Sequence, residues 1–201
     1  DFLCAAAAAT AAEGLFAPGR PVILTAGGTA YYDRVARKLS AGRDIGAPVE
    51  IIIRSGCYLT HDSGAYVEAF SAIRARDPEL PPDAFAPALM VVTHVQSRPE
   101  PGKAILAMGR RDAGTDAGMP LPLYVYRQGR DAGPARMPEG HRITAMNDQH
   151  AHLQCPPDSD LAVGDLVICG VSHPCTTFDK WHVVFVVDDA YNVVDAVRTF
   201  F

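Results

Sequence analysis

The sequence predicts an α/β unit followed by an all-β domain, and two observations lead to this division. In the first third, two strand-then-helix units follow one another, an order typical of a parallel sheet or barrel. After a proline-rich stretch over residues 78–87, apolar runs of strand length recur between clusters of Gly, Pro, Asp and Asn. Because proline ends helices and cannot donate to a central ladder, we predict domains over residues 1–80 and 81–201.

The elements of the first domain are short and strongly patterned. Residues 5–15 are rich in helix formers, and residues 21–25 form an apolar run of strand length. Helical spacing follows over residues 31–39. The next repeat has a β-branched run at 49–53, which suits a strand buried on both faces, and then a helix over about 63–76.

Seven strands are predicted in the second domain, which favours a closed or sandwich-like β structure. Trp181, Phe185 and the run 183–187 are expected in the core, because large apolar side chains are usually buried. The predicted strands cover residues 88–95, 104–108, 121–126, 142–146, 165–169, 183–187 and 193–198.

The composition excludes several classes of partner. Lys and Arg total 18 against 23 Asp and Glu, a formal charge of −5 without a dense basic stripe, so we expect no nucleic acid partner. The apolar runs fall short of the roughly 18–20 residues that span a bilayer, so we expect a soluble protein without a membrane partner. Five cysteines without a C-x-x-C pair give no disulfide framework and favour a reducing, cytoplasmic location.

Two glycine-containing loops follow the two strands of the first domain. They are Thr25–Thr29 (TAGGT) and Arg54–Cys57 (RSGC). Backbone N–H groups, a helix N-terminus and a Thr hydroxyl can together cradle a phosphate, and ligands bind at the carboxyl ends of parallel strands. Neither loop matches a complete nucleotide-binding motif, so plain strand-to-helix turns stay open as the alternative.

His173-Pro174-Cys175 is a candidate metal site. On an extended segment, residues i and i+2 face the same way, and imidazole nitrogen with thiolate sulfur is a ligand set that zinc accepts. Two protein ligands are too few for a closed structural site, so a metal here keeps open positions, the catalytic arrangement. The alternative is a loop histidine beside a buried cysteine.

His150-Ala151-His152 repeats the i, i+2 spacing after Asn147-Asp148-Gln149. His150 could supply an acid/base group or a further ligand, and the alternative is a polar strand edge. Cys57 with His61 lacks an orienting third group, so we do not expect a nucleophile and base there.

Five ordered segments together carry a family resemblance. They are TAGGTAYYD (25–33), RSGCYLTHD (54–62), GRRDAGTDAGMP (109–120), NDQHAHL (147–153) and SHPCTTFDKW (172–181). With them the chain resembles the C-terminal portion of the D-serine dehydratase and D-threonine aldolase-like family, pyridoxal-phosphate enzymes of the alanine racemase fold type. The similarity is greatest to the amino-acid deaminase branch.

The resemblance implies that residues 1–80 are the end of an (α/β)₈ barrel that binds pyridoxal 5′-phosphate and that the rest is the β-barrel or β-sandwich domain that follows it. By position, Gly28 and Thr29 hold the cofactor phosphate from one loop, and Gly56 with Cys57 from the other. Arg54 matches the arginine that faces the pyridine nitrogen in alanine racemases.

The resemblance also assigns the metal candidates, and two further residues are candidates for catalysis. His173 and Cys175 match the Zn²⁺ ligands of the dehydratases. Asp116, within GRRDAGTDAGMP, and His150, within NDQHAHL, are the candidate catalytic residues. A homodimer is implied, in which the β domain of one subunit completes the active site of its partner.

The implied activity is a lyase reaction that converts D-serine or D-threonine to a 2-oxo acid and ammonia. Aldol cleavage to glycine and an aldehyde stays open, as does racemisation, which needs a second base and no metal. A different class of function is a β domain that serves only dimerisation and metal binding.

One catalytic group of the family has no counterpart here. The Schiff-base lysine of this fold lies at the first barrel strand, and Lys38, Lys103 and Lys180 do not match its place. The chain also opens at Asp1 in helix-forming sequence without a capping residue. We therefore expect a C-terminal piece of a longer protein that is inactive alone.

Overall fold

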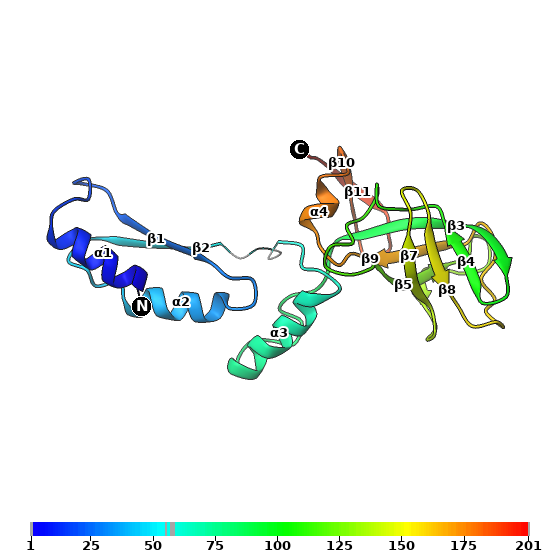
Figure 1. Ribbon diagram of the computed structural model, residues 1–201, viewed down its shortest axis with the longest axis horizontal. Helices are drawn as coiled ribbons and strands as arrows, with labels where there is room; N and C mark the ends of the chain where they lie inside the picture. The colour runs from blue at the N-terminus through cyan, green and yellow to red at the C-terminus, as the bar shows by residue number, and fades with distance from the viewer. Residues whose placement is uncertain (1, 55, 57–58, 201) are drawn as a thin grey trace. The chain divides into compact units, whose positions relative to one another are not determined.

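The computed structural model describes residues 2–54, 56 and 59–200, which form two compact units (Figure 1). The first unit comprises Asp1–Tyr58 and Ala69–Pro82, and the second comprises Leu59–Glu68 and Asp83–Phe201. The boundary at residue 80 stays a prediction. Among the described residues, no helix has the length and apolar character needed to cross a membrane.

The first unit is built on two parallel strands, β1 (Val22–Gly27) and β2 (Val49–Arg54). Helices α1 (Phe2–Ala12) and α2 (Tyr32–Ala41) pack on these strands. The helix α3 (Ala65–Arg76) follows β2 in the chain. The predicted strand-then-helix order is confirmed, whereas a barrel is not shown and stays a prediction.

Burial of β2 on both faces was expected and is wrong for the described chain. Ile52 is 41% exposed and Ile53 is 36% exposed. Within the described residues β2 pairs only with β1, so the two-stranded sheet leaves part of its surface uncovered.

An ion pair joins two distant segments of the first unit. Arg76 donates to both carboxylate oxygens of Asp33, from Nε at 3.1 Å and from Nη2 at 2.9 Å, and it also donates to the carbonyl of Ala30. The bonded guanidinium of Arg76 lowers the pKa of Asp33 from its ordinary value. This contact fixes the start of α2 against the end of α3.

The second unit is a curled antiparallel sheet of seven strands (Figure 1). Its order is β6-β5-β9-β3-β4-β8-β7, and β7 approaches β5, so the sheet folds back toward itself. The strands are β3 (Met90–Glu100), β4 (Lys103–Leu106), β5 (Leu121–Tyr126), β6 (Ala135–Arg136), β7 (Arg142–Met146), β8 (Ala151–Gln154) and β9 (Leu166–Gly170). The predicted all-β domain is confirmed.

Two strands of this sheet were missed from the sequence. Strand β6 has only two residues, and β8 alternates apolar residues with His152 and Gln154. Neither segment contains the β-branched or aromatic run that predicts a strand. His150-Ala151-His152 thus leads into a strand whose polar positions are the less buried ones. Strand β8 pairs with both β4 and β7, so it is not at an edge of the sheet.

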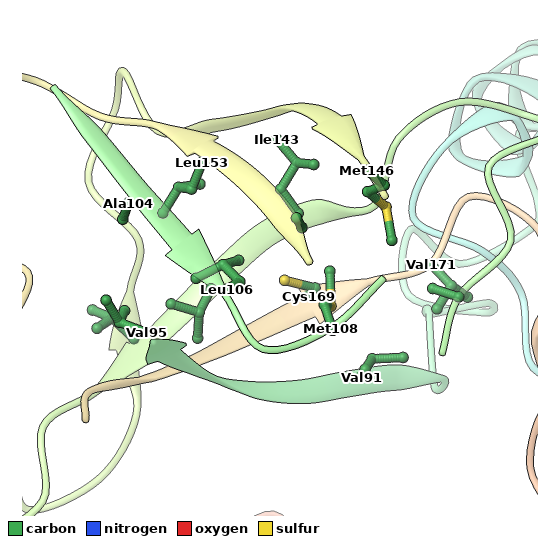
Figure 2. Close-up of a cluster of buried hydrophobic side chains, with 14 of the residues drawn as sticks. Val91, Val95, Ala104, Leu106, Met108, Ile143, Met146, Leu153, Cys169 and Val171 are labelled. Carbon is green, nitrogen blue, oxygen red and sulfur yellow. The ribbon is translucent and has the colours of Figure 1, made fainter. Parts of the chain in front are cut away.

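The inner face of the curled sheet forms the core of the second unit (Figure 2). Leu106 and Leu153 are fully buried, and Ala104 of β4 pairs in register with Leu153 of β8. Because side chains alternate between the faces of a strand, this register sends the apolar set of both strands to the same side.

The antiparallel pair β10 (Val183–Val187) and β11 (Val193–Arg198) lies outside the seven-stranded sheet. Phe185 is 66% exposed and Trp181 is 40% exposed, so the expected burial of this segment in the core is wrong. Only Val184 of β10 packs against the core cluster. A ribbon of two strands that pairs with no other described strand leaves most of its side chains uncovered.

Shortening Leu106 to alanine should destabilise the second unit by about 3 kcal/mol, because it opens a cavity among fully buried side chains. Denaturant unfolding followed by the fluorescence of Trp181, the single tryptophan, measures this loss in the second unit. Val163→Ala is the control, since Val163 is 63% exposed and should change stability by less than about 0.5 kcal/mol. Equal effects of the two substitutions would contradict the placement of the core.

Candidate functional site

The two strand-end loops of the first unit meet. Gly27 of β1 is in register with Arg54 of β2, so the loops that follow start at the same edge of the parallel pair. A Cβ added to Gly56 would lie 2.6 Å from Thr29 Oγ1. The missing side chain of Gly56 therefore permits the close approach of the second loop to the hydroxyl of the first.

The residues of these loops suit a phosphate group. Gly28 has φ +143°, a conformation that L side chains rarely adopt, and it lies before α2. Thr29 offers a hydroxyl, and backbone amides near a helix N-terminus attract anions. The structure thus brings Gly28, Thr29 and Gly56 into neighbouring loops.

Arg54 and Cys57 are the other two residues of these loops that were predicted to bind the cofactor. Arg54 donates from Nε to the hydroxyl of Thr25 at 3.0 Å. This contact does not test whether the arginine faces a pyridine nitrogen, which stays a prediction. Cys57 lies outside the described residues.

In the second unit His173 pairs with Asp116. Nδ1 of His173 is hydrogen-bonded to Oδ2 of Asp116, and Thr176 Oγ1 donates to Oδ1 of the same carboxylate at 2.7 Å. The histidine and aspartate are separated by 57 residues in the chain. The hydrogen bond from His173 and that from Thr176 lower the pKa of Asp116 from its ordinary value.

The backbone between the two metal candidates is not extended, as the sequence argument assumed. Pro174 has φ −61° and ψ −43°, and the short helix α4 (Cys175–Phe178) begins directly after it. A proline at the start of a helix sets helical dihedral angles in advance. The extended geometry was therefore wrong, while His173 and Cys175 as metal ligands stay a prediction.

The loop that carries Asp116 is held against the segment that carries His173. Ser172 Oγ donates to the carbonyl of Gly118 at 2.6 Å, and the amide of Gly114 donates to Thr177 Oγ1 at 3.2 Å. The indole of Trp181 donates to the carbonyl of Asp112 at 2.8 Å. Two segments of the family resemblance, GRRDAGTDAGMP and SHPCTTFDKW, thus form one hydrogen-bonded group.

The cysteines differ in their capacity to bind a metal. Cys175 is exposed, whereas burial raises the pKa of the Cys169 thiol to about 12 and keeps it protonated. Across residues 2–54, 56 and 59–200, no group of three or more His, Cys, Asp or Glu side chains is placed to hold a metal ion. Imidazole nitrogen and thiolate sulfur are donors that zinc accepts, so the chemistry of His173 and Cys175 fits this metal.

His150 lies in a separate surface depression of about 420 Å³. Its lining residues are Arg110, Met146, Asn147, Asp148, Gln149 and His150. Neither of the paired side chains Asp116 and His173 lines this depression. The structure therefore brings Asp116 to His173 but does not bring His150 to them, and a catalytic role for His150 stays a prediction.

Thr176 and Thr177 were missed as site residues. Thr177 Oγ1 donates to the carbonyl of His173 at 3.0 Å, four residues back in the chain. A threonine pair just after a histidine at a helix start is a local signal for such backbone contacts. The contact of Thr176 with Asp116 has no local signal, because it spans 60 residues.

Comparison with known proteins places this geometry in a family. Residues 88–187 match the family model described as "Putative serine dehydratase domain". These residues are similar to a serine dehydratase domain. The match covers the seven-stranded sheet, the His173–Asp116 pair and β10, so the predicted family resemblance is confirmed for this part of the chain.

Solved structures with the same fold include the D-threonine aldolase from Filomicrobium marinum. The chain is 22% identical to it, with a TM-score of 0.53, over 82% of this chain and 45% of that chain. The D-threo-3-hydroxyaspartate dehydratase from Delftia sp. HT23 is 19% identical, with a TM-score of 0.61, over 98% and 48%. An alanine racemase-like protein from Idiomarina loihiensis is 16% identical, with a TM-score of 0.50, over 75% and 38%.

The chain spans about half the length of the first two of these structures. No curated protein matches it. The fold of the chain is similar to that of the matched parts of these structures.

Gly56→Ala should weaken binding of pyridoxal 5′-phosphate about tenfold, because its methyl group would collide with Thr29 Oγ1 and displace the loop. Equilibrium dialysis of the purified protein measures the affinity. Gly133→Ala is the matched control, since a Cβ there meets nothing within 4 Å. Unchanged affinity in Gly56→Ala would refute the phosphate cradle.

Proposed function

We propose that this chain is part of a pyridoxal phosphate- and zinc-dependent dehydratase that converts D-serine or D-threonine to a 2-oxo acid and ammonia. The observation that carries the proposal is the similarity of residues 88–187 to a serine dehydratase domain, with the His173–Asp116 pair inside it. The proposed enzyme also needs a place for the cofactor phosphate, and the strand-end loops of the first unit supply residues that suit one.

The cofactor role of the first unit rests on its loops. Gly28 and Thr29 would hold the phosphate from the first loop, and Gly56 and Cys57 would hold it from the second. Pyridoxal phosphate supplies an electron sink for loss of the substrate α-proton. The hydroxyl of Thr29 and the amides before α2 bind and orient the phosphate, which fixes the reactive end of the cofactor.

The metal role of the second unit rests on His173 and Cys175. Two variants of a D-threo-3-hydroxyaspartate dehydratase have been solved, one with histidine and one with cysteine replaced by alanine, and the cysteine variant is described as metal-free. The substituted histidine precedes the substituted cysteine by two positions, the spacing of His173 and Cys175. This spacing supports the proposal that both residues bind zinc.

His173 and Cys175 would hold the zinc ion, which would supply a Lewis acid for departure of the β-hydroxyl group. His150, which lines a separate surface depression, is proposed as a proton carrier. We also propose a cytoplasmic homodimer.

The test uses the protein encoded by the whole reading frame that contains this sequence. It is stripped of metal, loaded with pyridoxal phosphate and given D-serine with and without zinc, and pyruvate is measured. The proposal predicts zinc-dependent pyruvate formation, and it predicts its loss in His173→Ala. Lys103→Ala is the control and should leave pyruvate formation unchanged, since Lys103 lies at the start of β4.

Other products would identify other reactions. Glycine and acetaldehyde from D-threonine, without a 2-oxo acid, would replace the dehydratase by an aldolase, the activity in the name of the Filomicrobium structure. L-Serine as the only product, with no need for zinc, would indicate a racemase. If pyruvate forms equally in His173→Ala, the metal role is wrong.

A further inference from the structure

We infer that Asp116 is a positioning residue for His173 and holds its imidazole in the tautomer that leaves Nε2 as the metal-binding nitrogen. The inference rests on the zinc site of the proposed function. It adds a residue that supports this site without being a zinc ligand itself. It starts from one contact, the hydrogen bond between Nδ1 of His173 and Oδ2 of Asp116.

The direction of this hydrogen bond follows from the charge of the carboxylate. Asp116 is hydrogen-bonded to His173 Nδ1 and to Thr176 Oγ1, and an aspartate carboxyl group is ordinarily ionised near neutral pH. An ionised carboxylate can only accept. Nδ1 of His173 must therefore carry the proton.

The position of that proton decides which nitrogen can bind a metal. A neutral imidazole has one N–H and one lone pair, so a proton on Nδ1 leaves the lone pair on Nε2. Metal-binding histidines commonly donate their second N–H to a carboxylate, which fixes the ring and raises its basicity. The His173–Asp116 pair has this arrangement.

Both partners are themselves held in place. Thr177 Oγ1 donates to the backbone carbonyl of His173 at 3.0 Å. Thr176 Oγ1 donates to Oδ1 of Asp116 at 2.7 Å, so each carboxylate oxygen has a partner. Gly114 and Gly118, on either side of Asp116, are hydrogen-bonded to Thr177 and Ser172. The aspartate is therefore anchored to the same segment as the histidine it orients.

These contacts favour an orienting role over direct coordination. Within the part of the chain that the structure describes, Asp116 joins no group of three or more potential metal ligands. Its two oxygens accept from a histidine and a threonine, so binding a metal would require giving up one of these bonds. Asp116 acts through His173.

The experiment measures zinc affinity by competition with a chelator in the metal-free protein. Asp116→Ala should weaken zinc binding about 10- to 100-fold, the usual cost of losing such a partner. Asp179→Asn is the charge control, because Asp179 lies at the C-terminal end of α4 and pairs with Lys180. It should leave the affinity unchanged.

A double-mutant cycle separates positioning from a direct role. If Asp116 acts only through His173, adding Asp116→Ala to His173→Ala should weaken zinc binding no further. An equal additional loss in both backgrounds would overturn the inference and make Asp116 a ligand or a source of general attraction. Wild-type affinity in Asp116→Ala would also overturn it.

Nitrogen NMR of the metal-free protein reads the tautomer without zinc or activity. Neutral His173 should carry its proton on Nδ1 in the wild type, and Asp116→Ala should move population to the Nε2–H form. Thr176→Val, which keeps the carboxylate, should retain the wild-type tautomer. An Nε2–H form in the wild type would refute the inference.

The outcomes distinguish this inference from the proposed function. If the wild type binds zinc and Asp116→Ala binds it equally well, only the positioning role fails. If the wild type does not bind zinc, the metal part of the proposed function fails and the positioning role falls with it.

Discussion

The candidate metal site depends on the hydrogen bonds that join two loops. His173 and Asp116 lie far apart in the chain, on segments that have no ladder contact of their own. Side chain to backbone bonds made by Ser172, Thr177 and Trp181 hold these segments together. These bonds act together with the packing of Ala113 and Val171 in the core to hold the imidazole and the carboxylate in contact.

The curled sheet supplies the fixed frame for these loops. Strand β9 ends at Gly170, immediately before the segment that carries His173, and β5 begins just after the loop that carries Asp116. The two strands pair, with Leu121 opposite Gly170, so the sheet itself brings the ends of both loops together. The buried core behind this sheet therefore stabilises the geometry of the site.

Much of the fold could be predicted from the sequence, because the strands with dense β-branched or aromatic runs have a strong local signal. Strand β7 and the hairpin strands β10 and β11 have the predicted bounds, whereas β6 and β8 lack such runs and were missed. The exposure of Phe185 could not be predicted, since it depends on whether another element covers the pair of strands β10 and β11. The pairing of Asp116 with His173 is likewise a tertiary contact without local periodicity.

The central claim is that His173 and Cys175 hold a zinc ion in an open site. X-ray absorption at the zinc edge of the loaded protein tests this most directly. The claim predicts one sulfur at about 2.3 Å and imidazole nitrogen at about 2.0 Å, with oxygen ligands filling the rest of the shell. A shell of oxygen and nitrogen without sulfur, unchanged in Cys175→Ala, would contradict it.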